Sequence, residues 1–282
     1  MNNIQTRTVS GAVFVAIIVG AVLFSQFGTL VILTLLLSFL GLREFNGLIK
    51  AKYGVNVPLV ESVIGAILMT ALCQSVGMSY FSTFVLVAYI LFVFVVLALE
   101  LWRKQENPVM TWGMFVLGQT YIAIPFALLN TTLNFSGSKA VVLAVFVMVW
   151  VNDTFAYLTG MLSGKSKKGN HKMFPRVSPK KSWEGLAGGA VFAVLASVVF
   201  YYVAETKLTL PMWIGLSIVI VVFGTIGDLV ESLLKRTLGI KDSGTLIPGH
   251  GGLLDRMDSV LFASVGAFVY VFYVVMVGLY GC

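Results

Sequence analysis

The segment from Ser232 to Asp258 contains most of the side chains in this chain that could do chemistry on a phosphate group. Its charged residues are Lys235, Arg236, Lys241, Asp242, Asp255, Arg256 and Asp258. Carboxylate oxygens are preferred ligands of Mg²⁺, and Lys and Arg neutralise the charge that remains on a phosphate chain. The segment therefore predicts a site that holds Mg²⁺ against a triphosphate.

The same segment contains a glycine-rich turn, Pro248-Gly249-His250-Gly251-Gly252. Glycines let backbone N–H groups approach an anion closely, and neighbouring amides can form a nest for phosphate. Most turns of this kind bind nothing, so the acidic and basic residues that follow it carry the prediction. His250 could act as a base, or it could be a hydrogen-bond partner within the turn.

Helical spacing connects the residues that precede this turn. Asp228, Ser232 and Lys235 follow one another at i, i+4 and i+7, with Arg236 at i+8 and Glu231 beside them. Acid, hydroxyl and base therefore share one helix face, and two glycines among the four residues before Asp228 permit another helix to approach closely. Lys and Arg near a helix C-terminus also stabilise the helix dipole, which is the structural alternative.

Two further groups could contribute to a site. Asp153 lies in an apolar stretch, about 10 Å of helix before Gly160, where a charge usually faces a cavity, an ion or a partner. A structural ion pair with a neighbouring helix is the alternative. In the segment from Ser178 to Gly185, Lys180 and Lys181 could bind a lipid phosphate, whereas Ser182 could bind substrate or cap the following helix.

Composition shows where these residues must lie. The chain has 282 residues, of which 58% are hydrophobic and 11% charged, with a mean hydropathy of +0.95. Soluble domains carry about a quarter charged residues, so an all-α polytopic membrane protein is predicted. Two cysteines form no disulfide framework. The net charge of +7 follows the predicted topology, which argues against nucleic-acid binding.

Nine stretches are long and apolar enough to be candidate spans, since a span needs roughly 20 residues. They are residues 8–26, 28–48, 57–77, 79–99, 109–129, 139–160, 185–204, 209–230 and 259–280. With the N-terminus inside, 17 of the 19 Lys and Arg residues fall on the cytoplasmic side, leaving Lys139 and Lys207 outside. This split predicts a cytoplasmic N-terminus and an external C-terminus. The expected location is the inner membrane of a bacterium.

The cytoplasmic loops 161–184 and 231–258 hold most of the residues that could do chemistry. Residues 131–282 are therefore predicted to form the catalytic region, and residues 1–130 a scaffold of about five helices. The second span runs into Arg43 and Glu44, so its inner end is expected to be amphipathic and interfacial.

Three motifs in the catalytic region resemble the signature of the phosphatidate cytidylyltransferases, also called CDP-diacylglycerol synthases. They are Ser232-x-Leu234-Lys235-Arg236, Lys241-Asp242-x-Gly244 and Pro248-x-His250-Gly251-Gly252-Leu253-x-Asp255-Arg256-Met257-Asp258. They fit the signature at each specified position and spacing. Trp150-x-x-Asp153-x-x-Ala156-Tyr157 and the segment from Ser178 to Gly185 also look like motifs of that family.

The resemblance implies transfer of CMP from CTP to phosphatidate at the cytoplasmic membrane face, with Mg²⁺ required and a second, monovalent cation as a further expectation. Asp228 and Asp255 are then the expected metal ligands, with Asp258 and Asp153 in support. The residues expected to hold the phosphates are Lys235, Arg236, Lys241 and Arg256. The further residues expected to bind substrate are Lys180, Lys181, Ser182, Ser232, His250, Gly251 and Gly252.

Two other functions remain open from the residues. An ion-coupled transporter would use intramembrane Asp153 and Asp228, although the inverted repeats typical of many transporters are not visible. A membrane enzyme acting on another lipid phosphate is the second alternative. The glycines could pack helices within one protomer or between two, so a homodimer is also considered.

Overall fold

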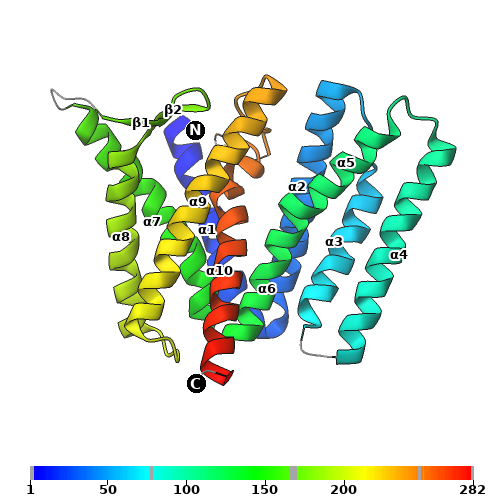
Figure 1. The fold of residues 1–282 in the computed structure, drawn as a ribbon. Helices are drawn as coiled ribbons and strands as arrows, with labels where there is room; N and C mark the ends of the chain where they lie inside the picture. The colour runs from blue at the N-terminus through cyan, green and yellow to red at the C-terminus, as the bar shows by residue number, and fades with distance from the viewer. Residues whose placement is uncertain (1–2, 77–78, 166–169, 247–248, 250, 281–282) are drawn as a thin grey trace. The chain divides into compact units, whose positions relative to one another are not determined.

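The computed structural model describes residues 3–76, 79–165, 170–246, 249 and 251–280. Within these ranges the chain consists of helices, one two-stranded sheet and the loops that connect them (Figure 1). Each predicted span coincides with helical structure, because runs of about 20 apolar residues can satisfy their backbone groups in a bilayer only as helices. The prediction of an all-helical architecture is therefore confirmed for the membrane-spanning segments.

The helices group into two compact units. The first comprises Met1–Thr131 and Leu238–Arg256, and the second comprises Thr132–Thr237 and Met257–Cys282. Three helices therefore contribute to both units: α6 (Ile124–Ser136), α10 (Leu254–Tyr280) and, by its last residue alone, α9 (Leu210–Leu238). The predicted division of labour between residues 1–130 and 131–282 stays a prediction.

The first unit is formed mainly by α-helices from the N-terminal half. They are α1 (Asn3–Leu23), α2 (Thr29–Tyr53), α3 (Leu59–Gln74), α4 (Ser79–Arg103) and α5 (Pro108–Gly118), with a 3-10 turn η1 (Ser25–Phe27) and a π-helical turn η2 (Gln119–Ala123). The π turn joins α5 directly to α6. The helix α2 continues for five residues beyond the predicted span and ends at Gly54, whose φ of 70° suits a glycine C-cap.

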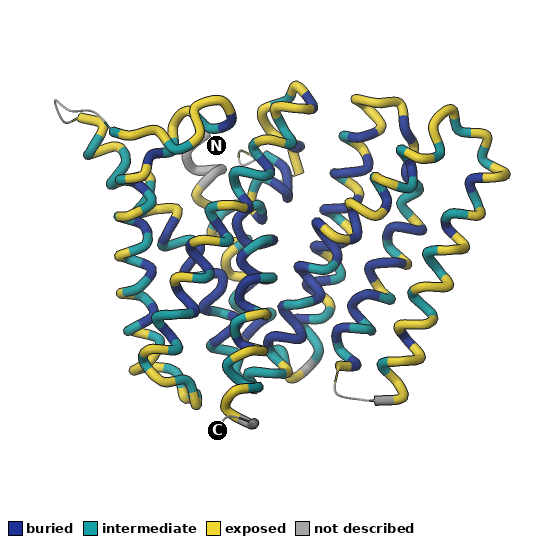
Figure 2. The backbone as a smooth tube through the Cα atoms, viewed as in Figure 1, coloured by how far each residue is buried: buried dark blue, intermediate teal, exposed yellow. Residues whose placement is uncertain are grey.

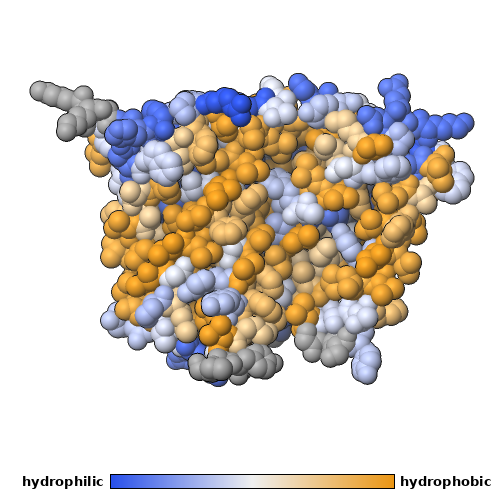
Figure 3. Space-filling model, in the orientation of Figure 1, coloured by the Kyte–Doolittle hydropathy of each residue, from blue (hydrophilic) through white to orange (hydrophobic). Residues whose placement is uncertain are grey.

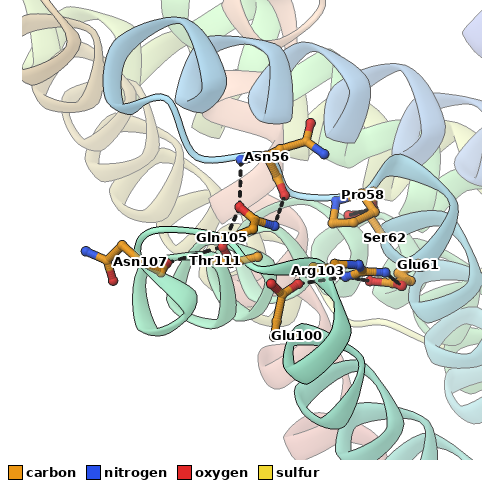
Figure 4. Close-up of polar contacts among 9 residues, drawn as sticks. All are labelled: Asn56, Pro58, Glu61, Ser62, Glu100, Arg103, Gln105, Asn107 and Thr111. Atoms are coloured by element: carbon orange, nitrogen blue, oxygen red, sulfur yellow. Dashed lines mark hydrogen bonds and ion pairs between the residues drawn. The ribbon is translucent and has the colours of Figure 1, made fainter.

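A polar network ties the α2–α3 connection to the α4–α5 connection in the first unit (Figure 4). The guanidinium of Arg103 donates to both carboxylate oxygens of buried Glu61 and, at 2.7 Å, to Glu100. The side-chain amide of Gln105 donates to the carbonyl of Asn56 at 2.9 Å and accepts from its N–H at 3.2 Å. These bonds fix the start of α3 against the end of α4 and join the two connections.

The second unit holds the remaining elements. They are α7 (Lys139–Gly164), β1 (Lys172–Phe174), β2 (Ser178–Ser182), α8 (Trp183–Val203) and α9 (Leu210–Leu238), together with most of α10. The antiparallel strands pair Lys172 with Ser182 and Phe174 with Ser178. In Figure 1 this hairpin lies at the same end of the unit as the C-terminal ends of α7 and α9.

The boundaries of the two predicted loops need correction. Residues 161–184 contain the β1–β2 hairpin as well as the last turn of α7, and within 231–258 helical structure continues to Leu238 and resumes at Leu254. The loop between α9 and α10 is therefore much shorter than predicted. Helices continue past the apolar stretch because polar residues at the membrane surface still form backbone hydrogen bonds. Short polar strands leave no apolar alternation to detect.

The helices α7 and α8 pack closely along a seam of small residues. Phe155 stacks on Phe192 with ring centroids 3.6 Å apart, and Thr159 donates a hydrogen bond to the carbonyl of Gly185 at 3.2 Å. A Cβ atom at Gly189 would lie 2.6 Å from the backbone oxygen of Asn152, so this position requires a glycine. The seam holds α7, which carries Asp153, against the helix that follows the hairpin.

The outer surfaces of the helices are apolar. Large hydrophobic side chains of α4 are exposed along its length, among them Phe84, Phe94 and Leu101 (Figure 2). Figure 3 shows hydrophobic residues along the sides of the helices and hydrophilic residues near their ends. Among the described residues, seven helical segments are long and apolar enough to cross a membrane, whereas the apolar parts of α1 and α3 are shorter. The protein is therefore a multi-pass membrane protein.

Replacement of Gly189 by alanine tests the α7–α8 seam. We expect Gly189→Ala to lower the free energy of unfolding by about 1–3 kcal/mol, because the added methyl group would displace a backbone. The control is Gly113→Ala in α5, where a Cβ meets nothing within 4 Å and alanine should be neutral or stabilising. The measurement is the free energy of unfolding of both variants and of wild type in detergent. A Gly189→Ala variant as stable as wild type would contradict the close packing.

Candidate active site

Asp228 in α9 is the centre of a polar cluster in the second unit. Its Oδ1 accepts a hydrogen bond from Ser232 Oγ at 3.2 Å, one helical turn later. Its Oδ2 lies 2.5 Å from the Nζ atom of Lys181, which β2 supplies. Both charged side chains are about a quarter exposed. The predicted helix face is thus confirmed for Asp228 and Ser232, and the structure adds a cation from the hairpin.

A second ion pair follows on the same helix. Lys235 Nζ lies 3.0 Å from a carboxylate oxygen of Glu231, whose side chain is 1% exposed. Lys235, which was predicted to bind phosphate, thus has a buried carboxylate partner one helical turn earlier. Arg236 is exposed, and its Nε lies 3.5 Å from the carbonyl of Val177 in the hairpin. The C-terminal end of α9 and the hairpin are therefore joined through both Lys181 and Arg236.

Three helices of the second unit meet beside Asp228. A Cβ at Gly224 would lie 3.6 Å from Ser259 in α10 and 3.7 Å from Val149 in α7. At Gly227 a Cβ would lie 2.5 Å from the backbone oxygen of Asp258, so only a glycine allows α9 and α10 this close. The two glycines therefore serve helix packing at the level of the acidic residues, as their spacing predicted.

This packing gathers carboxylates from three helices. Asp153 is exposed even though it lies well inside α7, and it accepts a long hydrogen bond, 3.4 Å, from Asn152. Asp258 accepts from the N–H of Ser259 at 2.7 Å. Asp153, Asp228 and Asp258 interact electrostatically with one another, and Asp258 also with Glu231. Asp153 therefore belongs to the same group as Asp228, as expected.

The charges of this group do not balance. In the ion pairs and electrostatic contacts that the structure describes, four carboxylates face two ammonium groups: those of Asp153, Asp228, Glu231 and Asp258 against those of Lys181 and Lys235. Such a surplus of negative charge suits a cation. In the part of the chain that the structure describes, no three His, Cys, Asp or Glu side chains form a complete metal site. Mg²⁺ is commonly held by one or two carboxylates plus substrate phosphates, so the residues fit an ion that binds together with a nucleotide.

The predicted site residues of the hairpin differ in what they contact. Lys181 reaches Asp228, whereas Lys180 is exposed on the surface. Ser182 is buried, and its Oγ accepts a hydrogen bond from the N–H of Gly185 at 3.2 Å, which confirms the capping alternative. Glu184 does not complete a capping box. Its carboxylate accepts instead from the N–H of His171 at 3.0 Å and closes the base of the hairpin.

The signature loop and the start of α10 lie in the first unit. Asp255 Oδ2 accepts hydrogen bonds from the N–H groups of Ser243 at 2.8 Å and Gly252 at 3.0 Å. Gly251 has a φ of +87°, a conformation that other residues rarely adopt. Lys241 and Arg256 are exposed. His250 lies outside the described residues.

Sequence reasoning missed Glu44 in α2. Its carboxylate accepts from Leu253 N at 2.8 Å, from Leu254 N at 3.3 Å and from the hydroxyl of Ser243. The available signal was a carboxylate just after an apolar stretch, but its partners lie about 200 residues away in the sequence. Ser243 was missed as well, because it occupies an unspecified position of the signature.

The fold and the site together define a class: a helical membrane protein with carboxylates and cations gathered near one end of its helices. The chain belongs to the cytidylyltransferase family, whose model matches residues 5–275. The resemblance that the signature motifs indicate is thereby confirmed.

Several named proteins are similar to this chain. A phosphatidate cytidylyltransferase of Staphylococcus saprophyticus is 34% identical over 233 residues, which cover 83% of this chain and 86% of that protein. The phosphatidate cytidylyltransferase of Staphylococcus haemolyticus is 33% identical over 234 residues, with the same coverage. That of Staphylococcus aureus strain COL is 33% identical over 233 residues, again covering 83% and 86%.

Proposed function

We propose that this protein transfers CMP from CTP to phosphatidate and forms CDP-diacylglycerol and pyrophosphate in phospholipid biosynthesis. The observation that carries the proposal is the match to the cytidylyltransferase family over nearly the whole chain, with phosphatidate cytidylyltransferases among its similar proteins. The acid and cation group around Asp228 gives that match a chemical basis.

The reaction needs positioning and charge neutralisation more than proton transfer. A phosphate oxygen of phosphatidate attacks the α-phosphorus of CTP, a new P–O bond forms, and the bond to the β-phosphate breaks to release pyrophosphate. The attacking phosphate is already anionic, so no strong protein base is required. The exposed cations Arg236, Lys241 and Arg256 and the half-buried Lys235 are proposed to neutralise the phosphate chain.

Mg²⁺ is the proposed cofactor, and Asp228 and Asp258 are its proposed ligands in the second unit. Their support is the surplus of carboxylates in the group that they share with Asp153. Asp255 is a third proposed ligand, and its only support is the resemblance to the family signature. A bound divalent ion would supply charge neutralisation at the reacting phosphate oxygens. The additional carboxylate of Asp153 favours a second, monovalent cation in the same group.

The hairpin is proposed to bind substrate through Lys181. Because its ammonium group already lies 2.5 Å from Asp228, a phosphate group held beside that carboxylate would come within its reach. Lys180 is exposed at the surface, where it could contact a lipid headgroup. Ser182, Ser232, His250, Gly251 and Gly252 stay in the proposal as substrate-binding residues.

A topology with nine spans completes the proposal, with the N-terminus in the cytoplasm and the C-terminus outside, in a bacterial inner membrane. The charge distribution of the second unit supports it. Lys139 begins α7 and Lys207 lies in the α8–α9 connection, at the end of the unit opposite the hairpin with its basic residues (Figure 1). Residues 131–282 are proposed to carry the catalytic groups on a scaffold formed by residues 1–130.

A homodimer is also part of the proposal. Its support is that Gly20 and Gly47, both within helices, have open space where a side chain would be, so a second copy could approach closely. The mass of the purified protein in detergent tests this, and a monomer at all concentrations would contradict it.

The activity assay tests the function directly. Purified protein should release pyrophosphate from CTP only when phosphatidate and Mg²⁺ are both present. Omitting any one component should abolish release, because the metal neutralises the phosphates and the lipid supplies the nucleophile. Folded protein that releases no pyrophosphate under several lipid and detergent conditions would contradict the proposal; release with another lipid phosphate would change only the substrate.

Replacement of the central carboxylate tests the site. We expect Asp228→Asn to lower kcat by about 100-fold or more, since it removes a charge aimed at the metal and at Lys181. The matched control is Glu205→Gln, an exposed carboxylate in the α8–α9 connection of the same unit, which should stay near wild type. Near-normal turnover of folded Asp228→Asn, measured by pyrophosphate release, would remove Asp228 from the proposed site.

Cysteine labelling tests the orientation. The chain has two cysteines, so in a Cys73→Ala variant Cys282 is the single thiol at the proposed external end. A membrane-impermeant maleimide should label it in spheroplasts without lysis. A cysteine placed at Asp242, with both native cysteines replaced, should react only after lysis. The reverse pattern would invert the proposed topology.

A further inference from the structure

The start of α10 is held by a carboxylate from a helix far away in the sequence. Glu44 accepts hydrogen bonds from the N–H groups of Leu253 and Leu254, at 2.8 and 3.3 Å. The hydroxyl of Ser243 donates to the same carboxylate. All of these residues belong to the first unit.

These bonds satisfy groups that the helix cannot satisfy by itself. The first N–H groups of a helix lack intrahelical partners, and a negative charge near them is favourable. The residue that precedes α10 is Leu253, whose side chain cannot act as a cap. Because Leu253, Leu254 and Ser243 are buried, loss of the carboxylate would leave buried donors without an acceptor.

Ser243 extends this contact to Asp255. Its hydroxyl donates to Glu44 and accepts from the N–H of Asp255 at 3.3 Å. Its own N–H donates to Asp255 Oδ2 at 2.8 Å. Ser243 therefore lies between the two carboxylates and couples the position of one to the other.

The glycines of the loop make room for this arrangement. A Cβ at Gly252 would overlap both Glu44 Oε1 and Ser243 Oγ, and a Cβ at Gly244 would lie 3.2 Å from the carboxyl carbon of Glu44. The packing of Glu44 thus requires a glycine at position 252 and leaves little room for a side chain at position 244.

The contact borders an open space. A pocket of about 360 Å³ lies between α2 and the loop, and its lining includes Arg43, Glu44, Gly47, Ser243, Gly244 and Thr245. The loop that Glu44 holds is therefore accessible to solutes as well as packed against α2.

We propose that Glu44 is a positioning residue for nucleotidyl transfer, one that sets the orientation of Asp255 through Ser243. The proposal rests on the proposed function. A nearby Ser, Thr or Asp would cap α10 at lower cost than a carboxylate in an apolar helix. A carboxylate in α2 also fixes the loop against α2. It thereby fixes the positions of Asp255 and Arg256, which follow the loop.

The test replaces Glu44 by glutamine, which keeps the shape but removes the charge and one acceptor. We expect kcat to fall about 100-fold while KM for CTP changes less than about twofold, because misplaced groups slow the reaction more than they weaken binding. In the protein without substrates, hydrogen exchange of the peptide covering residues 251–256 should become about tenfold faster, as loss of a bond to a charged group predicts.

Two further variants keep the test decisive. Glu106→Gln makes the same chemical change at an exposed position in the α4–α5 connection and should alter neither readout. Ser243→Ala removes the hydroxyl link alone. Its effect on kcat should not add to that of Glu44→Gln, because both break one chain of contacts. If Glu44→Gln does not fold, Ser243→Ala alone must show the loss of kcat.

The outcomes separate this inference from the proposed function. Unchanged hydrogen exchange of residues 251–256 in folded Glu44→Gln would overturn the inference. Faster exchange with an unchanged kcat would overturn it too, because Glu44 would then be a structural cap only. A wild-type protein that releases no pyrophosphate would overturn the proposed function and the catalytic part of the inference. The exchange measurement would still decide whether Glu44 holds the loop.

Discussion

A carboxylate within an apolar helix is stable only where a cation or several N–H and O–H donors face it. This constraint acts separately in each unit. Asp228 is satisfied by Lys181 and Ser232, and this draws the β1–β2 hairpin onto α9. Glu44 is satisfied by three donors of the signature loop, and this fixes the start of α10 against α2. Each of these carboxylates thus decides where a polar segment lies.

Close packing at glycines makes these contacts possible. Gly227 lets α9 approach the backbone of Asp258, and Gly252 leaves space for the carboxylate of Glu44. From the sequence, Gly252 was interpreted as part of a phosphate-binding nest, which stays a prediction. The structure adds a second reason for a glycine there, because a Cβ would overlap two oxygen atoms. One residue type therefore serves helix packing at one position and loop packing at another.

Much of the fold could be predicted because its signals are local. Runs of apolar residues predicted where the helices lie, and helical spacing predicted the face that Asp228 shares with Ser232. The hairpin at residues 172–182 was missed because its short strands are polar and lack an apolar alternation. The capping role of Ser182 was one of two predicted alternatives, and only the bond to Gly185 N showed it, whereas substrate binding by Ser182 stays a prediction.

The sequence by itself determined the class of this protein, because hydropathy, charge spacing and the signature motifs are each contained in short stretches of chain. It also predicted the residues available for chemistry. Only the tertiary structure decided which of them meet. Lys181 rather than Lys180 reaches Asp228, and Glu44 contacts Ser243 across 199 positions of sequence. Such pairings depend on how helices and loops pack, and no local pattern of residues encodes a contact between segments so far apart.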